Sequence, residues 1–215
     1  MKGTSEICQL AISFNEMTSQ MEGLYGKMEE MAYTDQLTSL PNRHMFNEKL
    51  HSIISNLQST GHGFALLMMD LNKFKPINDS LGHKVGDKVL QEVGKRLKIV
   101  LRKNDNILKI DHDTTATKED NSIARLGGDE FTAIITDINN AENAKIVAEK
   151  IIHAMQETFE IDHHQLNISI SIGIALCPQD ACTDTELLHK ADVAMYYSKN
   201  NQAHYAFYNE NMEKI

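Results

Sequence analysis

Between residues 7 and 31, apolar side chains recur in alternating steps of three and four, the a/d spacing of a left-handed coiled coil. The apolar seam is narrow and its flanks are polar. The pattern therefore favours pairing with a second helix, and packing on the chain's own domain is the alternative. Gly23 and Gly26 weaken the helix by up to about 1 kcal/mol each. The seam comprises Ile7, Leu10, Phe14, Met17, Met21, Leu24, Met28 and Met31.

Beyond this helix, strand and helix patterns alternate. A continuous apolar run over 64–69 predicts a buried strand that stops at Asp70. Short strands at 122–126 and 131–136 flank a Gly-Gly-Asp-Glu tip and predict a hairpin. Further expected elements are helices at about 45–57, 73–80, 87–101, 140–159 and 184–198, a half-buried strand within 166–176 that forms a hairpin with Ile161, and an edge strand at 205–208.

The composition suits one domain with a core and an appended helix. The chain has 215 residues, 41% apolar and 24% charged. Its formal net charge of -9 argues against a general nucleic-acid binder, but it permits a nucleotide enzyme that uses metal ions. There is no membrane-length apolar run, no signal peptide and no Rossmann or P-loop fingerprint, so we expect the chain as given to be soluble. The polar stretch 106–121 predicts a surface loop insertion.

Two glycines and two acids form the hairpin tip. Gly127 and Gly128 permit a tight turn and close approach of a ligand. Asp129 and Glu130 repel each other at such a tip, so local folding gains nothing from them. Divalent cations bind carboxylate oxygens and bridge to phosphates, which accounts for both acids. The tip therefore predicts a metal and phosphate site, with a plain turn as the alternative.

Asp70 offers a second carboxylate at the end of a predicted buried strand, where ligands collect in α/β sheets. If this strand pairs with the 122–136 hairpin, Asp70 and Asp129 converge and can hold two cations between them. A turn or capping role is the alternative for an isolated aspartate. The density of Asn, Asp, Gly and Lys over 72–87 is unusual for a plain connection.

Six blocks follow one another along residues 34–208: DQLTSLPNR at 35–43, DLNKFKPIND at 70–79, Gly-His and Gly-Asp within 82–87, RLGGDEF at 125–131, SIGIA at 171–175 and ADVAMY at 191–196. In this order they resemble the GGDEF domain of the diguanylate cyclase family. The resemblance implies a GGDEF domain at 34–215 that follows a signalling helix at 1–33. It implies an α/β fold with a central, mainly antiparallel five-stranded sheet flanked by helices, similar to nucleotidyl cyclases and polymerase palms.

The resemblance also implies an activity. GGDEF domains condense two GTP molecules into cyclic di-GMP and release two pyrophosphates, by attack of a ribose 3′-hydroxyl on an α-phosphate. Two Mg²⁺ (or Mn²⁺) ions per active site assist the reaction. Each protomer holds one GTP, so we expect a homodimer that pairs through residues 5–33 and through facing active sites. No nucleic-acid partner is expected.

Individual roles follow by motif position. Asp70 and Asp129 would bind metal through their side chains and Leu71 through its carbonyl. Glu130, after Gly127 and Gly128, would be a further ligand or charge stabiliser. The general base stays open between Asp129, Glu130 and a metal-bound hydroxide. The substrate-binding residues would be Asn78 and Asp87 at the guanine edge, and Phe74 and Lys75 with Lys199 at the phosphates. Structural roles are expected for Arg43, Asp79, His83 and Asp192.

The chain departs from the family pattern at several positions. Asn72 stands for the second aspartate of the strand end, and Ala203 replaces a phosphate-binding arginine, a loss of about 1–3 kcal/mol in GTP binding. Arg102 and Asp105 match the R-x-x-D inhibitory product site but lie well before its usual position. These departures keep a catalytically weak or inactive module that binds GTP or cyclic di-GMP as the alternative to an active cyclase. A cyclase that makes cyclic mono-GMP is a remote third hypothesis.

Both ends resemble parts of longer signalling proteins. Residues 5–17 resemble the last helix of a HAMP linker, which joins membrane spans to cytoplasmic domains. We therefore expect the cytoplasmic domain of an inner-membrane bacterial sensor. Residues 207–212 resemble the lead-in to an EAL phosphodiesterase domain, and whether one follows is left open.

Overall fold

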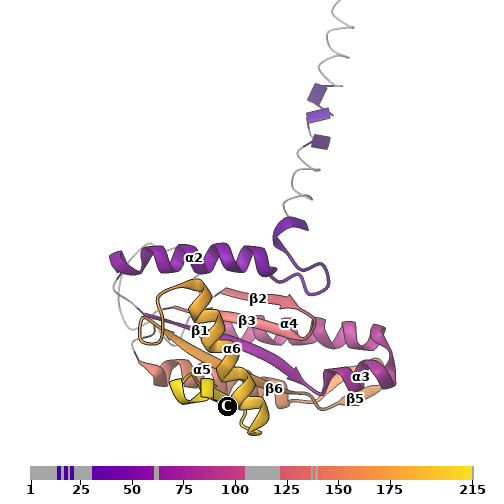
Figure 1. The fold of residues 1–215 in the computed structure, drawn as a ribbon. Coiled ribbons are helices and arrows are strands. Elements are labelled where there is room, and N and C mark those ends of the chain that lie inside the picture. The colour runs from indigo at the N-terminus through magenta and orange to yellow at the C-terminus, as the bar shows by residue number, and fades with distance from the viewer. Residues whose placement is uncertain are drawn as a thin grey trace, which may run out of the picture.

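The computed structural model describes residues 31–60, 63–104, 122–136, 138 and 140–214, and the helical positions 14–15, 17–18 and 20–21 (Figure 1). The elements in chain order are α2 (Arg43–Thr60), β1 (Phe64–Asn72), α3 (Phe74–Leu81), α4 (His83–Asn104), β2 (Ser122–Gly127), β3 (Glu130–Ile135), α5 (Ala141–Gln156), β4 (Phe159–Ile161), β5 (His164–Leu166), β6 (Ser169–Cys177), α6 (Asp184–Asn200), β7 (Tyr205–Phe207) and the 3-10 helix η1 (Glu210–Lys214).

A five-stranded sheet in the order β2-β3-β1-β6-β7 forms the centre of the domain. The first three pairings are antiparallel and β7 runs parallel to β6, so the sheet is mixed. The predicted central sheet and its flanking helices are confirmed. The predicted hairpin is β2-β3, and the register of β1 with β3 places Asp70 opposite Glu130.

Helices cover both faces of the sheet (Figure 1). Apolar side chains of α4 and α5 pack on one face, where they meet alternate residues of β1 and β6. Those of α2 and α6 pack on the other face. The prediction that the 166–176 strand is half-buried is therefore wrong. Ser171 is only 1% exposed, because small residues on that face of β6 let α6 lie close.

Gly173 sets this close approach. A Cβ at position 173 would lie 2.0 Å from the carbonyl oxygen of Ala191 and 2.1 Å from the backbone nitrogen of Met195. Both atoms belong to the backbone of α6, so no rotamer change relieves the overlap. The absent side chain allows α6 to seat directly on the central strands.

Two predicted helix boundaries and one predicted strand pairing are wrong. The helix expected over 140–159 ends at Gln156, because Phe159 begins β4 and lies under the guanidinium of Arg96, 3.7 Å from the ring centroid. β4 pairs with β5 in a separate two-stranded sheet, so the expected hairpin of Ile161 with the 166–176 strand does not form. The helix expected from residue 87 already begins at His83.

The predicted coiled coil lies mostly outside the described residues, as does the predicted loop 106–121. Of the predicted seam, Phe14, Met17, Met21 and Met31 are described, and each is exposed. Within the described part of the chain, no helix has the length and apolar character needed to cross a membrane.

Candidate active site

Asp70, Leu71, Asp129 and Glu130 meet where β1 ends and the β2-β3 turn begins. Antiparallel pairing puts Asp70 opposite Glu130. The backbone N–H of Leu71 donates to the carbonyl of Asp129 at 3.4 Å, which ties the turn to the end of β1. The structure thus brings the four predicted metal-site residues together.

The turn depends on its two glycines. Gly127 has φ +143° and Gly128 has φ +55°, both in the region that L side chains rarely adopt. Nothing lies within 4 Å of a Cβ built at either position, so the surrounding space is open. The glycines are required by the backbone path, and they leave the turn accessible to a ligand.

A clamp formed by Arg125 and Asp35 holds this turn. Nε and Nη2 of Arg125 donate to the carbonyl of Gly128 at 3.1 and 2.8 Å. Nη1 donates to both carboxylate oxygens of Asp35, each at 3.0 Å. Thr38 donates to Asp35 from its backbone N–H at 2.8 Å and from its hydroxyl at 2.6 Å. The clamp joins the 35–43 loop to the Gly127-Gly128 turn.

The clamp predicts a pH effect on stability. Burial alone would raise the pKa of Asp35, but hydrogen bonds from Thr38 and Arg125 lower it on balance. A lowered pKa means stability that is present above the unfolded-state pKa of about 4 and lost as pH falls through the folded-state pKa. We expect Asp35→Asn to lower the melting temperature at pH 7, and the gap from the wild type to shrink toward pH 3. A gap that stays constant with pH would contradict this linkage, and thermal melts at each pH measure it.

The site is rich in negative charge. Asp70 is 9% exposed, and burial raises its pKa, with Asp129 and Asp192 adding to the rise and Lys199 opposing it. Burial likewise raises the pKa of Glu130, against the attraction of Arg43, whose Nη2 lies 3.9 Å from Oε2. Asp192 on α6 acts on both groups. Sequence reasoning gave Asp192 a structural role, whereas α6, packed on β6, carries it close enough to act electrostatically on both acids.

The donor atoms suit a hard cation. Among the described residues, no group of three or more His, Cys, Asp and Glu side chains is already gathered closely enough to hold a metal ion. Asp70, Asp129 and the carbonyl of Leu71 offer only oxygen donors, and backbone pairing places these residues near one another. Oxygen ligands and an excess of negative charge favour Mg²⁺ or Mn²⁺ over softer metals. The residues therefore fit the expected ions.

A second group of predicted residues lies on α3 and α4. A Cβ at Gly86 would lie 1.9 Å from Oδ1 of Asn78, so the missing side chain makes room for this amide. Asp87 follows on α4 and is exposed. Phe74 and Lys75 lie in the first turn of α3, and the N-cap residue Lys73 supplies no side-chain cap. The backbone N–H groups of this turn are therefore suited to donate hydrogen bonds to an anion.

Comparison with known proteins decides the family. A family model described as the diguanylate cyclase GGDEF domain matches residues 32–117 and 114–204. The chain belongs to the GGDEF family. Signaling protein YkoW of Bacillus subtilis is 38% identical over 205 residues, which cover 94% of this chain and 24% of YkoW. Diguanylate cyclase TpbB of Pseudomonas aeruginosa is 34% identical over 205 residues, which cover 92% of this chain and 43% of TpbB.

The fold of this GGDEF domain is also similar to a solved structure of TpbB that comprises only the GGDEF domain. The two share 35% identity with a TM-score of 0.73, over 85% of this chain and 98% of that one. The chain thus spans less than half the length of the two curated relatives named above.

Two departures of this GGDEF domain are accommodated locally. The amide of Asn72 donates to Oγ of Ser169 at 3.2 Å, and its Oδ1 accepts from the hydroxyl of Ser171 at 3.0 Å. Both polar atoms of the asparagine side chain are therefore satisfied. Ala203 lies in the α6-β7 connection, where its carbonyl accepts from the hydroxyl of Ser198 at 2.6 Å, and it offers no cation to a phosphate. The side chain of Arg102 and all of Asp105 lie outside the described residues, so the inhibitory product site stays a prediction.

Proposed function

We propose that this GGDEF domain is an active diguanylate cyclase, which condenses two GTP molecules into cyclic di-GMP and releases two pyrophosphates. The observation that carries the proposal is the meeting of Asp70, Leu71, Asp129 and Glu130 at one end of β1. Support comes from the naming of TpbB as a diguanylate cyclase.

We assign metal binding and phosphate binding to different residues of the chain. Asp70 and Asp129 would hold the cations with the carbonyl of Leu71, and Glu130 would add negative charge beside them. Bound there, two Mg²⁺ or Mn²⁺ ions would supply Lewis acidity toward the α-phosphate and the attacking 3′-hydroxyl. Gly127 and Gly128 leave room for the phosphates.

Guanine recognition would rest on Asn78 and Asp87. The carboxylate of Asp87 can accept hydrogen bonds from guanine N1–H and the N2 amino group, which adenine does not offer. The amides of Phe74 and Lys75 face the phosphates from the first turn of α3, and the side chains of Lys75 and Lys199 supply positive charge.

One protomer carries half of the reaction site, so catalysis would require a homodimer. The a/d seam supports pairing through residues 5–33, and its described members Phe14 and Met17 are 68% and 62% exposed. The resemblance of residues 5–17 to a HAMP linker supports a cytoplasmic position in an inner-membrane sensor.

Gly86 gives a test of the guanine site. Gly86→Ala places a methyl group against the amide of Asn78 and is expected to raise KM for GTP about tenfold, the cost of one displaced hydrogen bond. Gly94→Ala on the same helix is the matched control, because its Cβ would meet side-chain atoms of Leu40 at 3.3 Å and Thr38 at 3.4 Å and none of Asn78. Steady-state kinetics separate the two. An unchanged KM in Gly86→Ala would remove Asn78 from guanine recognition.

A binding module is the second candidate, and Ala203 favours it because a phosphate-binding arginine is absent. Incubation with GTP and Mg²⁺, followed by mass spectrometry of the products, separates the hypotheses. Cyclic di-GMP supports the cyclase. Cyclic mono-GMP contradicts it, and so does recovery of unreacted GTP from a protein that binds GTP.

A further inference from the structure

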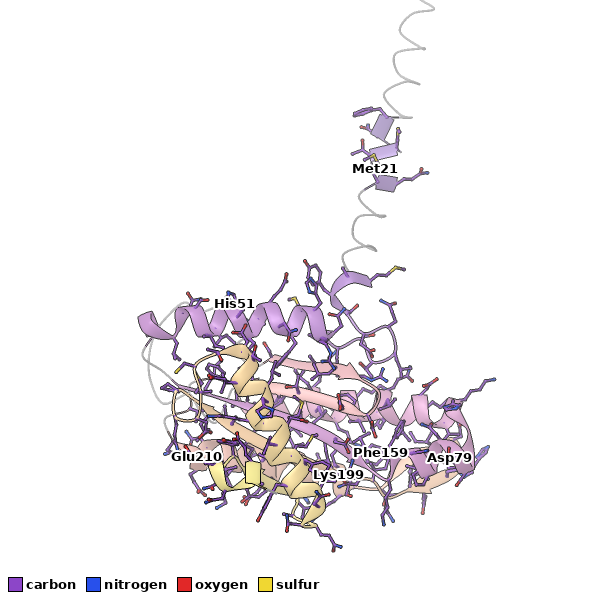
Figure 2. The ribbon with its side chains drawn as sticks, in the orientation of Figure 1. Met21, His51, Asp79, Phe159, Lys199 and Glu210 are labelled. Carbon is purple, nitrogen blue, oxygen red and sulfur yellow. The ribbon has the colours of Figure 1, made fainter. Side chains whose placement is uncertain are left out.

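Lys199 makes a direct ion pair with Asp70. Its ammonium nitrogen lies 2.5 Å from Oδ1 of Asp70, and the two side chains are 41% and 12% exposed. The two residues are 129 positions apart, since Asp70 lies on β1 and Lys199 lies near the C-terminal end of α6 (Figure 2). The cation therefore touches one of the carboxylate oxygens that we assign to metal binding.

The charges around this pair explain why it forms. Asp129 and Asp192 lie close enough to act electrostatically on Asp70, and Asp192 also acts on Glu130. Four acids facing one another at a partly buried site are unfavourable without positive charge. Among the described ion pairs, Lys199 is the partner of Asp70 and Arg43 is that of Glu130.

We propose that Lys199 is a displaceable counter-ion of the metal site, which occupies Asp70 in the ligand-free domain and moves to the triphosphate when a divalent cation binds. This inference rests on the proposed function, because it takes Asp70 as a metal ligand. An ammonium and a divalent cation repel each other, so they do not share one carboxylate oxygen at contact distance. A cation that takes Oδ1 of Asp70 without nucleotide displaces the ammonium from that oxygen, whereas a bound triphosphate would offer Lys199 a new anionic partner.

Metal and nucleotide binding are thereby coupled. When both arrive, Lys199 exchanges the carboxylate for phosphate oxygens and keeps an anionic partner. Each ligand therefore raises the affinity for the other, and the coupling is reciprocal. Ala203 makes the exchange more important in this chain, because the end of α6 offers the triphosphate a lysine without the arginine of the family pattern.

Lys199→Met tests the exchange, since it removes the charge and keeps most of the side-chain length. Without nucleotide, we expect Mn²⁺ to bind the variant about fivefold more tightly or better, because no ammonium competes for Asp70. With Mn²⁺ present, a non-hydrolysable GTP analogue is expected to bind about tenfold more weakly, because a charged hydrogen bond to phosphate is lost. Electron paramagnetic resonance of free Mn²⁺ and calorimetry with the analogue measure the two affinities.

Two further variants make the result decisive. Lys145→Met on α5 is the control, because that lysine pairs with Glu142 and makes no contact with the site. Lys199→Gln, a shorter neutral side chain, repeats the test, with circular dichroism to show that each variant is folded. Mn²⁺ affinity that is unchanged or reduced in the folded Lys199 variants overturns the inference. If the wild type still makes cyclic di-GMP in that case, the proposed function stands. A wild type that makes no cyclic di-GMP contradicts the proposed function, whatever the result for Lys199.

Discussion

Asp129→Asn is expected to reduce cyclic di-GMP synthesis roughly a hundred- to thousandfold. The substitution keeps the shape of the side chain and removes the negative charge that would hold a cation against the substrate. Asp129 lies in the turn that the Arg125 clamp and the Leu71 N–H hold in place, so an amide at this position is expected to leave the turn folded. The measurement is the initial rate of cyclic di-GMP formation at saturating GTP and Mg²⁺.

Glu142→Gln on α5 controls for the loss of one acid from the chain, and its rate is expected to match the wild type. Mn²⁺ titration of Asp129→Asn gives a second readout, because a lost ligand weakens metal binding whatever the rate. A variant that keeps a tenth or more of the wild-type rate would show that Asp129 is not a metal ligand in the reaction.

Gly173→Ala is expected to lower the free energy of unfolding by about 3 kcal/mol, near the upper end for overpacking. The new methyl group would meet the carbonyl oxygen of Ala191 at 2.0 Å and the backbone nitrogen of Met195 at 2.1 Å. Backbone atoms cannot rotate away, so α6 as a whole must shift from β6. Because α6 carries Lys199, the shift also disturbs the active site.

Urea unfolding of the wild type and of Gly173→Ala measures the loss of unfolding free energy. The comparison requires that both proteins show a similar dependence of this free energy on urea concentration. Gly94→Ala is the matched control in α4, and its effect is expected to stay within about 1 kcal/mol of zero, because the gain in helix propensity offsets a tight contact with Leu40 at 3.3 Å. Equal stability of Gly173→Ala and the wild type would mean that α6 does not depend on close contact with β6.

The sequence pattern predicted those strands and turns whose formation depends on residues close together in the sequence. The apolar run over 64–69 predicted β1, and the Gly-Gly turn between two short apolar segments predicted the β2-β3 hairpin. The boundary near Phe159 was wrong because a buried aromatic residue fits a helix end or a strand start equally well in sequence. Only the structure shows that Phe159 begins a strand, with the guanidinium of Arg96 stacked on its ring.

The candidate site was predictable in its members and less so in its contacts. Asp70 and Asp129 stand out in the sequence because acids at strand ends and hairpin tips need an explanation. The pairs that organise them join distant positions: Arg125 and Asp35 lie 90 residues apart, and Lys199 and Asp70 lie 129 apart. No periodicity connects residues at such separations. Asp192 was missed for the same reason, since only the packing of α6 on the sheet brings it close enough to act electrostatically on the acids.

The clamp on the Gly127-Gly128 turn also connects this turn to residues 31–33. The amide of Asn42 donates to the carbonyl of Ala32 at 2.8 Å, and its backbone N–H donates to the carbonyl of Tyr33 at 2.9 Å, so the helical residues 31–33 are bonded to the 35–43 loop. The same loop holds Arg125 through Asp35. Residues 31–33 are thus joined to the Gly127-Gly128 turn by a short chain of hydrogen bonds through the 35–43 loop and Arg125. A displacement of residues 31–33 would therefore act on the carbonyl of Gly128 without a rearrangement of the core.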